Sequence, residues 1–148
     1  MQPTFVLKEF ESLTPTELYA ILHLRTDVFV VEQNCAFQDL DYKDQKAYHL
    51  MGYIDNKLAA YTRLLPAGVT FDEPSIGRVV TASFIRNSGI GKKLMSESVD
   101  AVYRLFGRQP IKIGAQLYLK KFYESFGFQQ HSEVFLEDDI EHIHMLLS

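Results

Sequence analysis

One stretch decides the fold: RNSGIGK, residues 86–92, which joins a predicted strand to a predicted helix through two closely spaced glycines. Gly89 and Gly91 permit backbone conformations and a close approach that a side chain would block. The N–H groups that open a helix have no partner within it, and they point outward with the positive end of the helix dipole. Together with Arg86 and Lys92, these groups predict a binding site for a pyrophosphate.

Two common phosphate-binding motifs do not fit this stretch. A P-loop requires a glycine where Arg86 stands and a Ser or Thr where Lys93 stands. A dinucleotide-binding motif requires a third glycine at Leu94 and an acidic residue near the end of the next strand, which reads IKIG at residues 111–114. Two interpretations of residues 86–92 remain: they bind another phosphate-containing ligand, or they are a flexible, glycine-containing start of a helix that binds no ligand.

Length and composition indicate one globular domain. The chain has 148 residues, of which 47% are apolar, and its 8 Tyr and 11 Phe suffice for a hydrophobic core. No apolar run approaches the roughly 20 residues of a membrane-spanning helix, and the N-terminus lacks the pattern of a secretory signal. The single cysteine, Cys35, cannot form an internal disulfide. We therefore expect one domain, residues 1–148, in the cytoplasm and not at a membrane.

The charge is distributed unevenly along the chain. Residues 78–121 carry nine basic and two acidic side chains, a net charge of +7, whereas the rest of the chain carries −11. A basic segment within an acidic protein indicates an anionic ligand at that segment. The acidic remainder disfavours nucleic acid and favours a cationic second ligand.

The periodicity of apolar residues predicts a mixed α/β domain with antiparallel and parallel strands, in the order β-α-β-β-β-α-β-α-β-β. A capping box of Thr14 and Glu17, with Pro15 between them, begins the first helix. Gly107 ends the second helix. Strands are expected at residues 4–10, 48–54, 58–65, 76–81, 111–115, 131–135 and 142–147, and the third helix at 117–126. Arg25 interrupts the apolar stripe of the first helix. Either it is buried with an ion-pair partner, or its aliphatic chain covers apolar surface while its guanidinium group stays in water.

Three segments resemble the GNAT N-acetyltransferases. The pattern Arg-x-x-Gly-x-Gly at residues 86–91 is similar to the family's acetyl-coenzyme A signature, (Gln/Arg)-x-x-Gly-x-(Gly/Ala). QLYLKKFYESFGF, residues 116–128, resembles the family's Asn-x-x-Ala-x-x-Leu-Tyr-Glu-Lys-Leu-Gly-Phe, with Gln116 in place of Asn and Leu119 in place of Ala. LRTDVFVVEQ, residues 24–33, is similar to the small ElaA-type branch, which also carries Gly-Ala-Gln as at residues 114–116.

This resemblance spans roughly residues 14–147 and implies a GNAT-like fold, a central, mixed, mostly antiparallel sheet flanked by helices. It implies direct transfer of an acetyl group from acetyl-coenzyme A, the cosubstrate, to a primary amine. The backbone N–H of Val80 is expected to stabilise the oxyanion. Tyr123 is expected to be the general acid, on the view that a phenol, with a reference pKa of about 10, gives its proton to the departing thiolate, whose conjugate acid has a reference pKa of about 8.5. The residues expected to bind the coenzyme are Val79, Val80, Thr81, Arg86, Asn87, Ser88, Gly89, Ile90, Gly91, Lys92 and Gln116.

The general base has two candidates in the sequence. Glu32 follows an apolar run at the end of the first helix, where burial would raise its pKa. His49 starts a central strand and has a suitable intrinsic pKa, although a lone histidine is more often structural. An ordered water that relays the proton would make a base unnecessary.

The acceptor stays open: a polyamine-like molecule, an amino acid or antibiotic, or a peptide N-terminus or lysine. A non-catalytic coenzyme A-binding sensor or interaction module is the alternative function. No metal site is expected. The pair His142 and His144 has no Cys near it in sequence, and such pairs on one strand face are usually surface residues; the acidic pattern of Asp39, Asp41 and Asp44 lacks the Gly and Glu of a calcium loop. An exposed last strand would allow a homodimer.

Overall fold

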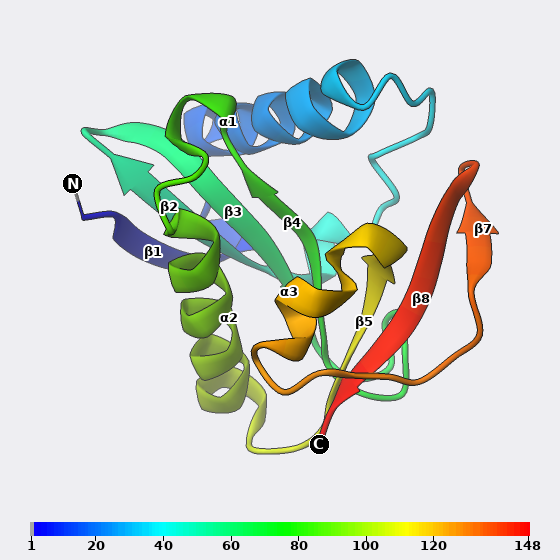
Figure 1. Cartoon of the computed structure of the whole chain (residues 1–148). Coiled ribbons are helices and arrows are strands. Elements are labelled where there is room, and N and C mark those ends of the chain that lie inside the picture. Colours follow the sequence, from blue (N-terminus) through cyan, green and yellow to red (C-terminus); the bar gives the residue numbers. More distant parts are fainter. Residues whose placement is uncertain (1) are drawn as a thin grey trace.

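The computed structural model describes residues 2–148, which form two antiparallel sheets and three α-helices (Figure 1). The first sheet contains, in spatial order, β1 (Thr4–Glu9), β2 (Tyr48–Ile54), β3 (Lys57–Leu65) and β4 (Ser75–Thr81). In the second, β8 (Ile140–Leu147) pairs with β5 (Ile111–Gln116), β6 (Gln129–Gln130) and β7 (Phe135–Glu137). The helices are α1 (Pro15–Thr26), α2 (Ile90–Phe106) and α3 (Lys120–Glu124). The α/β class is confirmed, and the predicted order holds except at the penultimate strand, where the two short strands β6 and β7 stand in place of one.

The strand expected at residues 131–135 is wrong, because the ladder with β8 is interrupted there. The hydroxyl of Ser132, in place of a backbone carbonyl, accepts a hydrogen bond from the N–H of His144 at 2.8 Å. Pairing resumes only at Phe135, where β7 begins. β8 also begins two residues earlier than predicted, at Ile140.

β4 and β5 begin side by side and then separate (Figure 1). The N–H of Lys112 donates to the carbonyl of Pro74 at 3.0 Å, where both strands start. Beyond this point the described chain forms no ladder between β4 and β5, and each strand belongs to its own antiparallel sheet. The single mixed sheet of the prediction is therefore divided in two, and the strands diverge as the arms of a V.

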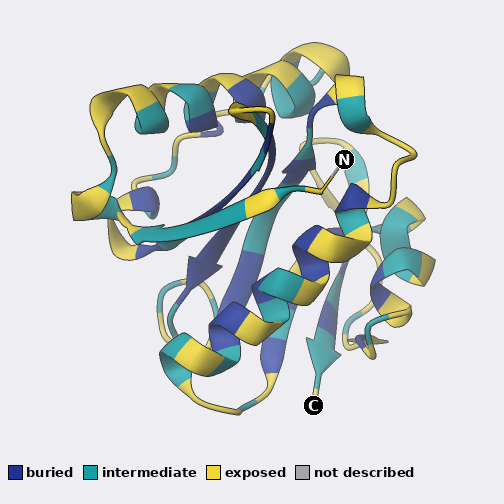
Figure 2. Ribbon diagram, turned by 90° about the vertical axis from the view of Figure 1, so that its left-hand side faces the viewer, coloured by how far each residue is buried: buried dark blue, intermediate teal, exposed yellow. Residues whose placement is uncertain are grey.

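The helices cover both faces of the first sheet, because alternate residues of β2 and β3 point to opposite sides. Met51 and Tyr61 pack with Ile21 and Leu24 of α1. Their neighbours Leu50 and Ala60 pack with Ile90 and Leu94 of α2 on the other side. Figure 2 shows the strands buried between the helices, whose outer faces are exposed. Within residues 2–148, no helix has both the length and the apolar character needed to cross a bilayer.

The first helix begins as predicted but continues in a wider form. The Thr14 hydroxyl accepts from the N–H of Glu17 at 3.1 Å, and the Glu17 carboxylate accepts from the N–H of Thr14 at 2.9 Å. After α1, Asp27–Glu32 form a π-helix, in which the N–H of Cys35 donates to the carbonyl of Val30, five residues back. Such wide turns often occur at functional sites. Here the segment carries Glu32 to the opening between β4 and β5.

Candidate functional site

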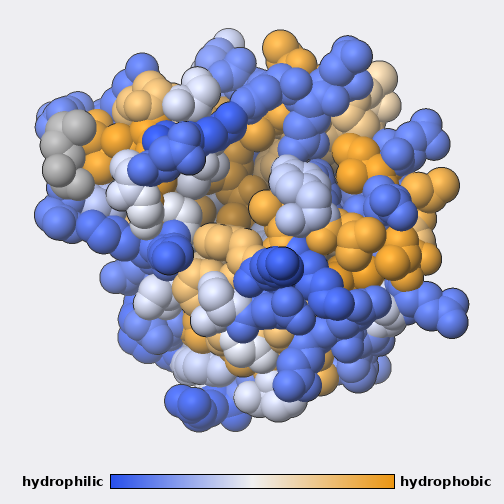
Figure 3. All heavy atoms as spheres, viewed as in Figure 1, coloured by the Kyte–Doolittle hydropathy of each residue, from blue (hydrophilic) through white to orange (hydrophobic). Residues whose placement is uncertain are grey.

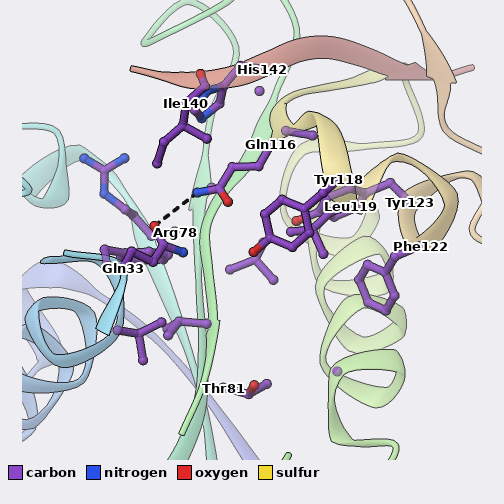
Figure 4. Close-up of a pocket in the computed structure, with 18 of the residues that line it drawn as sticks. Gln33, Arg78, Thr81, Gln116, Tyr118, Leu119, Phe122, Tyr123, Ile140 and His142 are labelled. Carbon is purple, nitrogen blue, oxygen red and sulfur yellow. Dashed lines mark hydrogen bonds between the residues drawn. The ribbon is translucent and has the colours of Figure 1, made fainter. Parts of the chain in front are cut away.

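A cavity of about 660 Å³ lies between the diverging arms of β4 and β5. Its walls come from the π-helix after α1, from β4, from the loop before α2, from the segment between β5 and α3, and from the β7–β8 turn (Figure 4). Figure 3 shows a hollow with apolar atoms in its floor and hydrophilic groups around much of its rim. A ligand with a long uncharged middle and a charged end fits such a shape.

One end of the cavity is formed by the glycine loop at the end of β4. Gly89, the residue before α2, has a φ of +85°, and Asn87 has a φ of +65°. Among residues 2–148, no side chain caps the N-terminus of α2, and a Cβ added at Gly89 would meet no atom within 4 Å. This end therefore presents unpaired helix N–H groups to open space, which is the geometry of an anion site.

Most of the residues expected in the coenzyme site line the cavity. They are Val79, Val80, Thr81, Arg86, Asn87, Gly89, Ile90, Gly91 and Gln116. Ser88 and Lys92 do not line it. The Ser88 hydroxyl instead donates to the carbonyl of Ile85, which stabilises the loop from behind.

Glu32 lies in the cavity but does not have the environment that the sequence predicts. Its side chain is 39% exposed and forms an ion pair with Arg86, the first residue of the glycine motif. The hydrogen bond from Arg86 lowers the pKa of Glu32, whereas the expected burial would have raised it. Glu32 is thus a charged partner of the anion site and a poor base at neutral pH.

The strand β4 forms the long wall of the cavity. It pairs with β3 along one edge, so the N–H groups of its other edge face the opening. Its ladder with β3 is irregular between Tyr61 and Arg63, and Arg78 adopts a φ of +51°, which is rare for a residue with a side chain. The strand therefore bends where it leaves β5.

An ion-pair network holds this bend. Arg78 donates to the carboxylate of Asp39 at 2.7 Å and to its carbonyl at 2.8 Å. Asp39 also accepts from Arg25, which is completely buried on α1, at 2.9 Å. Arg63 pairs with Asp41 at 2.8 Å. The acidic loop thus ties α1 to β3 and β4, which confirms the ion-pair alternative for Arg25.

The network sets the charge of its carboxylates. Burial alone would raise the pKa of Asp41, but hydrogen bonds and charge from Arg63 outweigh it and lower this pKa to about 2. Asp44 is similarly affected: Arg25 and Arg63 lower its pKa against the effect of burial. Both carboxylates are therefore ionised at neutral pH and compensate the buried guanidinium groups.

Tyr123 reaches the cavity from α3. Its side chain is 5% exposed and packs against the rings of Phe122 and Phe128. Burial raises the pKa of its phenol further above the usual value of about 10. Tyr123 therefore carries its proton throughout the physiological pH range and can donate a hydrogen bond within the cavity.

His49 lies outside the cavity, which removes it as a candidate base. It is fully buried in the first sheet. Its Nε2 donates to the carbonyl of Asp44 at 2.9 Å, and its Nδ1 lies 2.6 Å from the Tyr61 hydroxyl, which donates to it. Burial lowers the pKa of His49, so the ring is neutral. Its two ring nitrogens are both engaged, and its role is structural.

Gln33, to which the sequence assigned no role, lines the cavity beside Gln116, which was expected there. The amide of Gln116 donates to the Oε1 of Gln33 at 3.3 Å, so these two side chains bridge the gap between β5 and the π-helix (Figure 4). Glu137 and Asp138 of the acidic turn also line the cavity, as does His142 of β8. The sequence indicates that the acidic turn at residues 137–139 would attract a cationic amine if it faced a cleft, and it offers His142 only as half of a rejected metal pair; the fold shows that they line the cavity. Within residues 2–148 no group of three acidic, His or Cys side chains is arranged to hold a metal.

Residues 22–148 match the family model described as Acetyltransferase (GNAT) domain. The chain is 40% identical over 135 residues to Protein ElaA of Escherichia coli strain K12, covering 90% of this chain and 88% of ElaA. The crystal structure of E. coli ElaA has a TM-score of 0.92 at 36% identity and covers 99% of both chains.

Two further crystal structures share the fold. An acyl-CoA N-acyltransferase from Pseudomonas aeruginosa has a TM-score of 0.94 at 42% identity, with 99% of both chains covered. A GNAT family acetyltransferase from Elizabethkingia anophelis with acetyl-CoA bound has a TM-score of 0.66 at 16% identity, and the match covers 99% of this chain and 97% of that one.

Proposed function

The chain belongs to the GNAT acetyltransferase family, and on that premise we propose that it transfers an acetyl group from acetyl-coenzyme A directly to a primary amine. The observation that carries the proposal is the cavity between β4 and β5, with an anion-binding loop at one end and Tyr123 in its wall. The pyrophosphate would bind the N–H groups after Gly89 together with Arg86. The uncharged arm of the coenzyme would follow β4 into the V.

The thioester would then lie beside the free edge of β4. The N–H of Val80, the donor expected from the sequence, points towards β3, because the N–H of Ala82 donates to the carbonyl of Ala59 and the residues of β4 alternate along this ladder. The N–H of a neighbour, Val79 or Thr81, is therefore the candidate to stabilise the negative charge that develops on the carbonyl oxygen. Removing such a donor typically costs about 3–4 kcal/mol of transition-state stabilisation. No metal is needed for this step, because the backbone supplies the positive potential.

Tyr123 would stabilise the departing sulfur. Complete proton transfer from a phenol, with a pKa of about 10, to a thiolate whose conjugate acid has a pKa near 8.5 is uphill by about 2 kcal/mol. Burial makes the phenol of Tyr123 still less acidic. Tyr123 would therefore donate a hydrogen bond that strengthens as negative charge develops on the sulfur. Its proton would move completely to the sulfur only if the buried thiolate became as basic as the phenolate.

The acceptor amine would enter from the end of the cavity opposite the glycine loop. Glu137 and Asp138 lie at that end, and their charge supports an acceptor that is cationic in solution. Cys35 also lines the cavity, and its Sγ lies 3.7 Å from the carbonyl oxygen of Asp138, a hydrogen-bond acceptor that does not remove the thiol proton. Direct transfer therefore requires no acetylated cysteine.

The test is release of free thiol from acetyl-coenzyme A in the presence of spermidine, L-lysine, histamine or an alanine-initiated peptide, with mass spectrometry of the amine. Acetylated product and retention of the rate in the Cys35→Ser variant are expected. An acetyl group found on Cys35, with loss of activity in that variant, would refute direct transfer. Tight coenzyme binding without thiol release on any amine would favour a non-catalytic coenzyme-binding module.

A further inference from the structure

One imidazole lines the cavity within residues 2–148, that of His142 on β8. Its side chain is 12% exposed, so it is held in the wall while one edge of the ring stays accessible. Phe135 of β7 stacks on the ring, with the centroids 6.0 Å apart and the planes at 26°. This packing limits the ring to one orientation, and Figure 4 shows the side chain at the same end of the cavity as Gln116 and Gln33.

The hydrogen bond of His142 determines where its proton lies. The Nδ1 is 2.7 Å from the carbonyl oxygen of Ile140. Because a carbonyl oxygen can only accept, Nδ1 carries the hydrogen, and the neutral ring has its lone pair on Nε2. The Nε2 lies 3.5 Å from a carboxylate oxygen of Glu137, which would stabilise the ring once it becomes protonated. A neutral imidazole with a directed lone pair and a nearby carboxylate is suited to accept a proton.

The register of the strands gives the height of this imidazole along β4, which is the level of Arg78, the residue before Val79. The N–H of Lys112, in β5, donates to the carbonyl of Pro74, just before β4. Four residues further along each strand stand Gln116 on β5 and Arg78 on β4. Since strands rise about 3.3 Å per residue, Gln116 and Arg78 stand at similar heights on the two arms. His142 is the direct partner of Gln116 in the β5–β8 ladder. It therefore faces the bend of β4, away from the glycine loop.

We propose that His142 is the general base that takes the proton from the acceptor amine, an assignment that rests on the proposed acetyl transfer. The acceptor, cationic in solution, first gives one proton to Nε2 of His142; the neutral nitrogen then forms a bond to the thioester carbon and releases its second proton to solvent. The carbon–sulfur bond breaks, and the thiolate takes up a proton from its surroundings. His142 returns its proton to solvent, so free coenzyme A and the acetylated amine are the products.

The two residues that the sequence indicated do not fill this role. Glu32 is paired with Arg86 at the coenzyme end, and His49 is buried outside the cavity. The charged or titratable groups that line the acceptor end with His142 are Glu137 from β7, Asp138 from the following turn, Arg78 from β4 and Cys35. Of these, Arg78 is bound by Asp39, and Glu137 contacts the ring directly.

The experiment compares His142→Ala with His144→Ala, using acetyl-coenzyme A and the panel amine on which the unaltered protein is most active. His144 is a matched control, because its ring lies two residues along the same strand and also contacts Phe135, but it does not line the cavity. We expect His142→Ala to lower kcat about 100-fold or more, with KM for acetyl-coenzyme A within about twofold, since a general base contributes 10²–10⁴ in rate. Added imidazole should restore part of the kcat of His142→Ala only.

The pH dependence of kcat/KM distinguishes a general base from a residue whose role is only structural. The rise of kcat/KM with pH in the unaltered protein should be missing in His142→Ala but present in His144→Ala. If His142→Ala keeps the wild-type kcat, or if both variants lose activity equally without imidazole rescue, the base assignment is wrong. If the unaltered protein binds acetyl-coenzyme A but acetylates no amine, the proposed function fails and the base assignment falls with it.

Discussion

The ion pair of Glu32 and Arg86 predicts that removing a carboxylate from the coenzyme site tightens binding. Arg86 cannot give its full charge to a pyrophosphate while it is paired with Glu32, so binding must first weaken this contact. The two side chains are 35% and 39% exposed, and ion pairs of such exposure contribute about 0.2–1 kcal/mol. Because 1.36 kcal/mol corresponds to a tenfold change, Glu32→Gln should lower the Kd for acetyl-coenzyme A by up to about fivefold.

Isothermal titration at low and at physiological ionic strength provides the assay. Glu137→Gln is the control, because it also removes one negative charge from the cavity but lies at the opposite end, where screening weakens its effect on the pyrophosphate. The gain in Glu32→Gln should shrink as salt is added. A Kd that is unchanged or larger in Glu32→Gln, or an equal decrease in both variants, would refute the competition between Glu32 and the coenzyme.

Three other predictions concern the acid, the loop and the ion-pair network. Tyr123→Phe should lower kcat about 100-fold and leave the Kd for acetyl-coenzyme A within about twofold, measured by thiol release and titration; an unchanged kcat would exclude Tyr123 as the donor to sulfur. Gly89→Val should abolish coenzyme binding while the circular dichroism spectrum is retained, since the side chain would enter open space at the anion site and strain a φ of +85°; wild-type affinity would contradict the loop assignment. The pKa of Asp41 is lowered from 3.8 to about 2, so its ionised carboxylate contributes about 2 kcal/mol to the free energy of unfolding above pH 4, and this contribution is lost as the pH falls towards 2. Urea titrations should show that the free energy of unfolding falls less between pH 4 and pH 2 in Asp41→Asn than in the unaltered protein. An equal fall in both proteins would contradict the role of Asp41.

Local patterns in the sequence predicted the parts of the fold that depend on local chemistry. The capping box at Thr14, the two glycines at 89 and 91, and the terminating Gly107 act within a few residues of chain, and each takes the predicted place. The shape of the cavity depends on the separation of β4 from β5, which no local pattern contains. The resemblance to a family implied one central sheet, so the separation of β4 from β5 was not predicted from it either.

The residues that were misplaced share one physical cause. Whether a titratable side chain is buried, paired or free depends on partners far away in the sequence. Glu32 and Arg86 are 54 residues apart, and Arg78 and Asp39 are 39 apart. His49 belongs to a strand buried on both faces, whereas His142 gains its position only because β8 pairs with β5 beside the opening. The sequence shows the charges of such residues but not their partners.

The most direct test of the central claim is a calorimetric titration of the purified protein with acetyl-coenzyme A, with NAD as the comparison ligand. Both ligands carry an adenine and a pyrophosphate, but only acetyl-coenzyme A has the long uncharged arm that the V between β4 and β5 would accept. We predict saturable binding of one acetyl-coenzyme A per chain, lost in Gly89→Val, and no binding of NAD. Absence of acetyl-coenzyme A binding, or equal binding of NAD, would contradict the account.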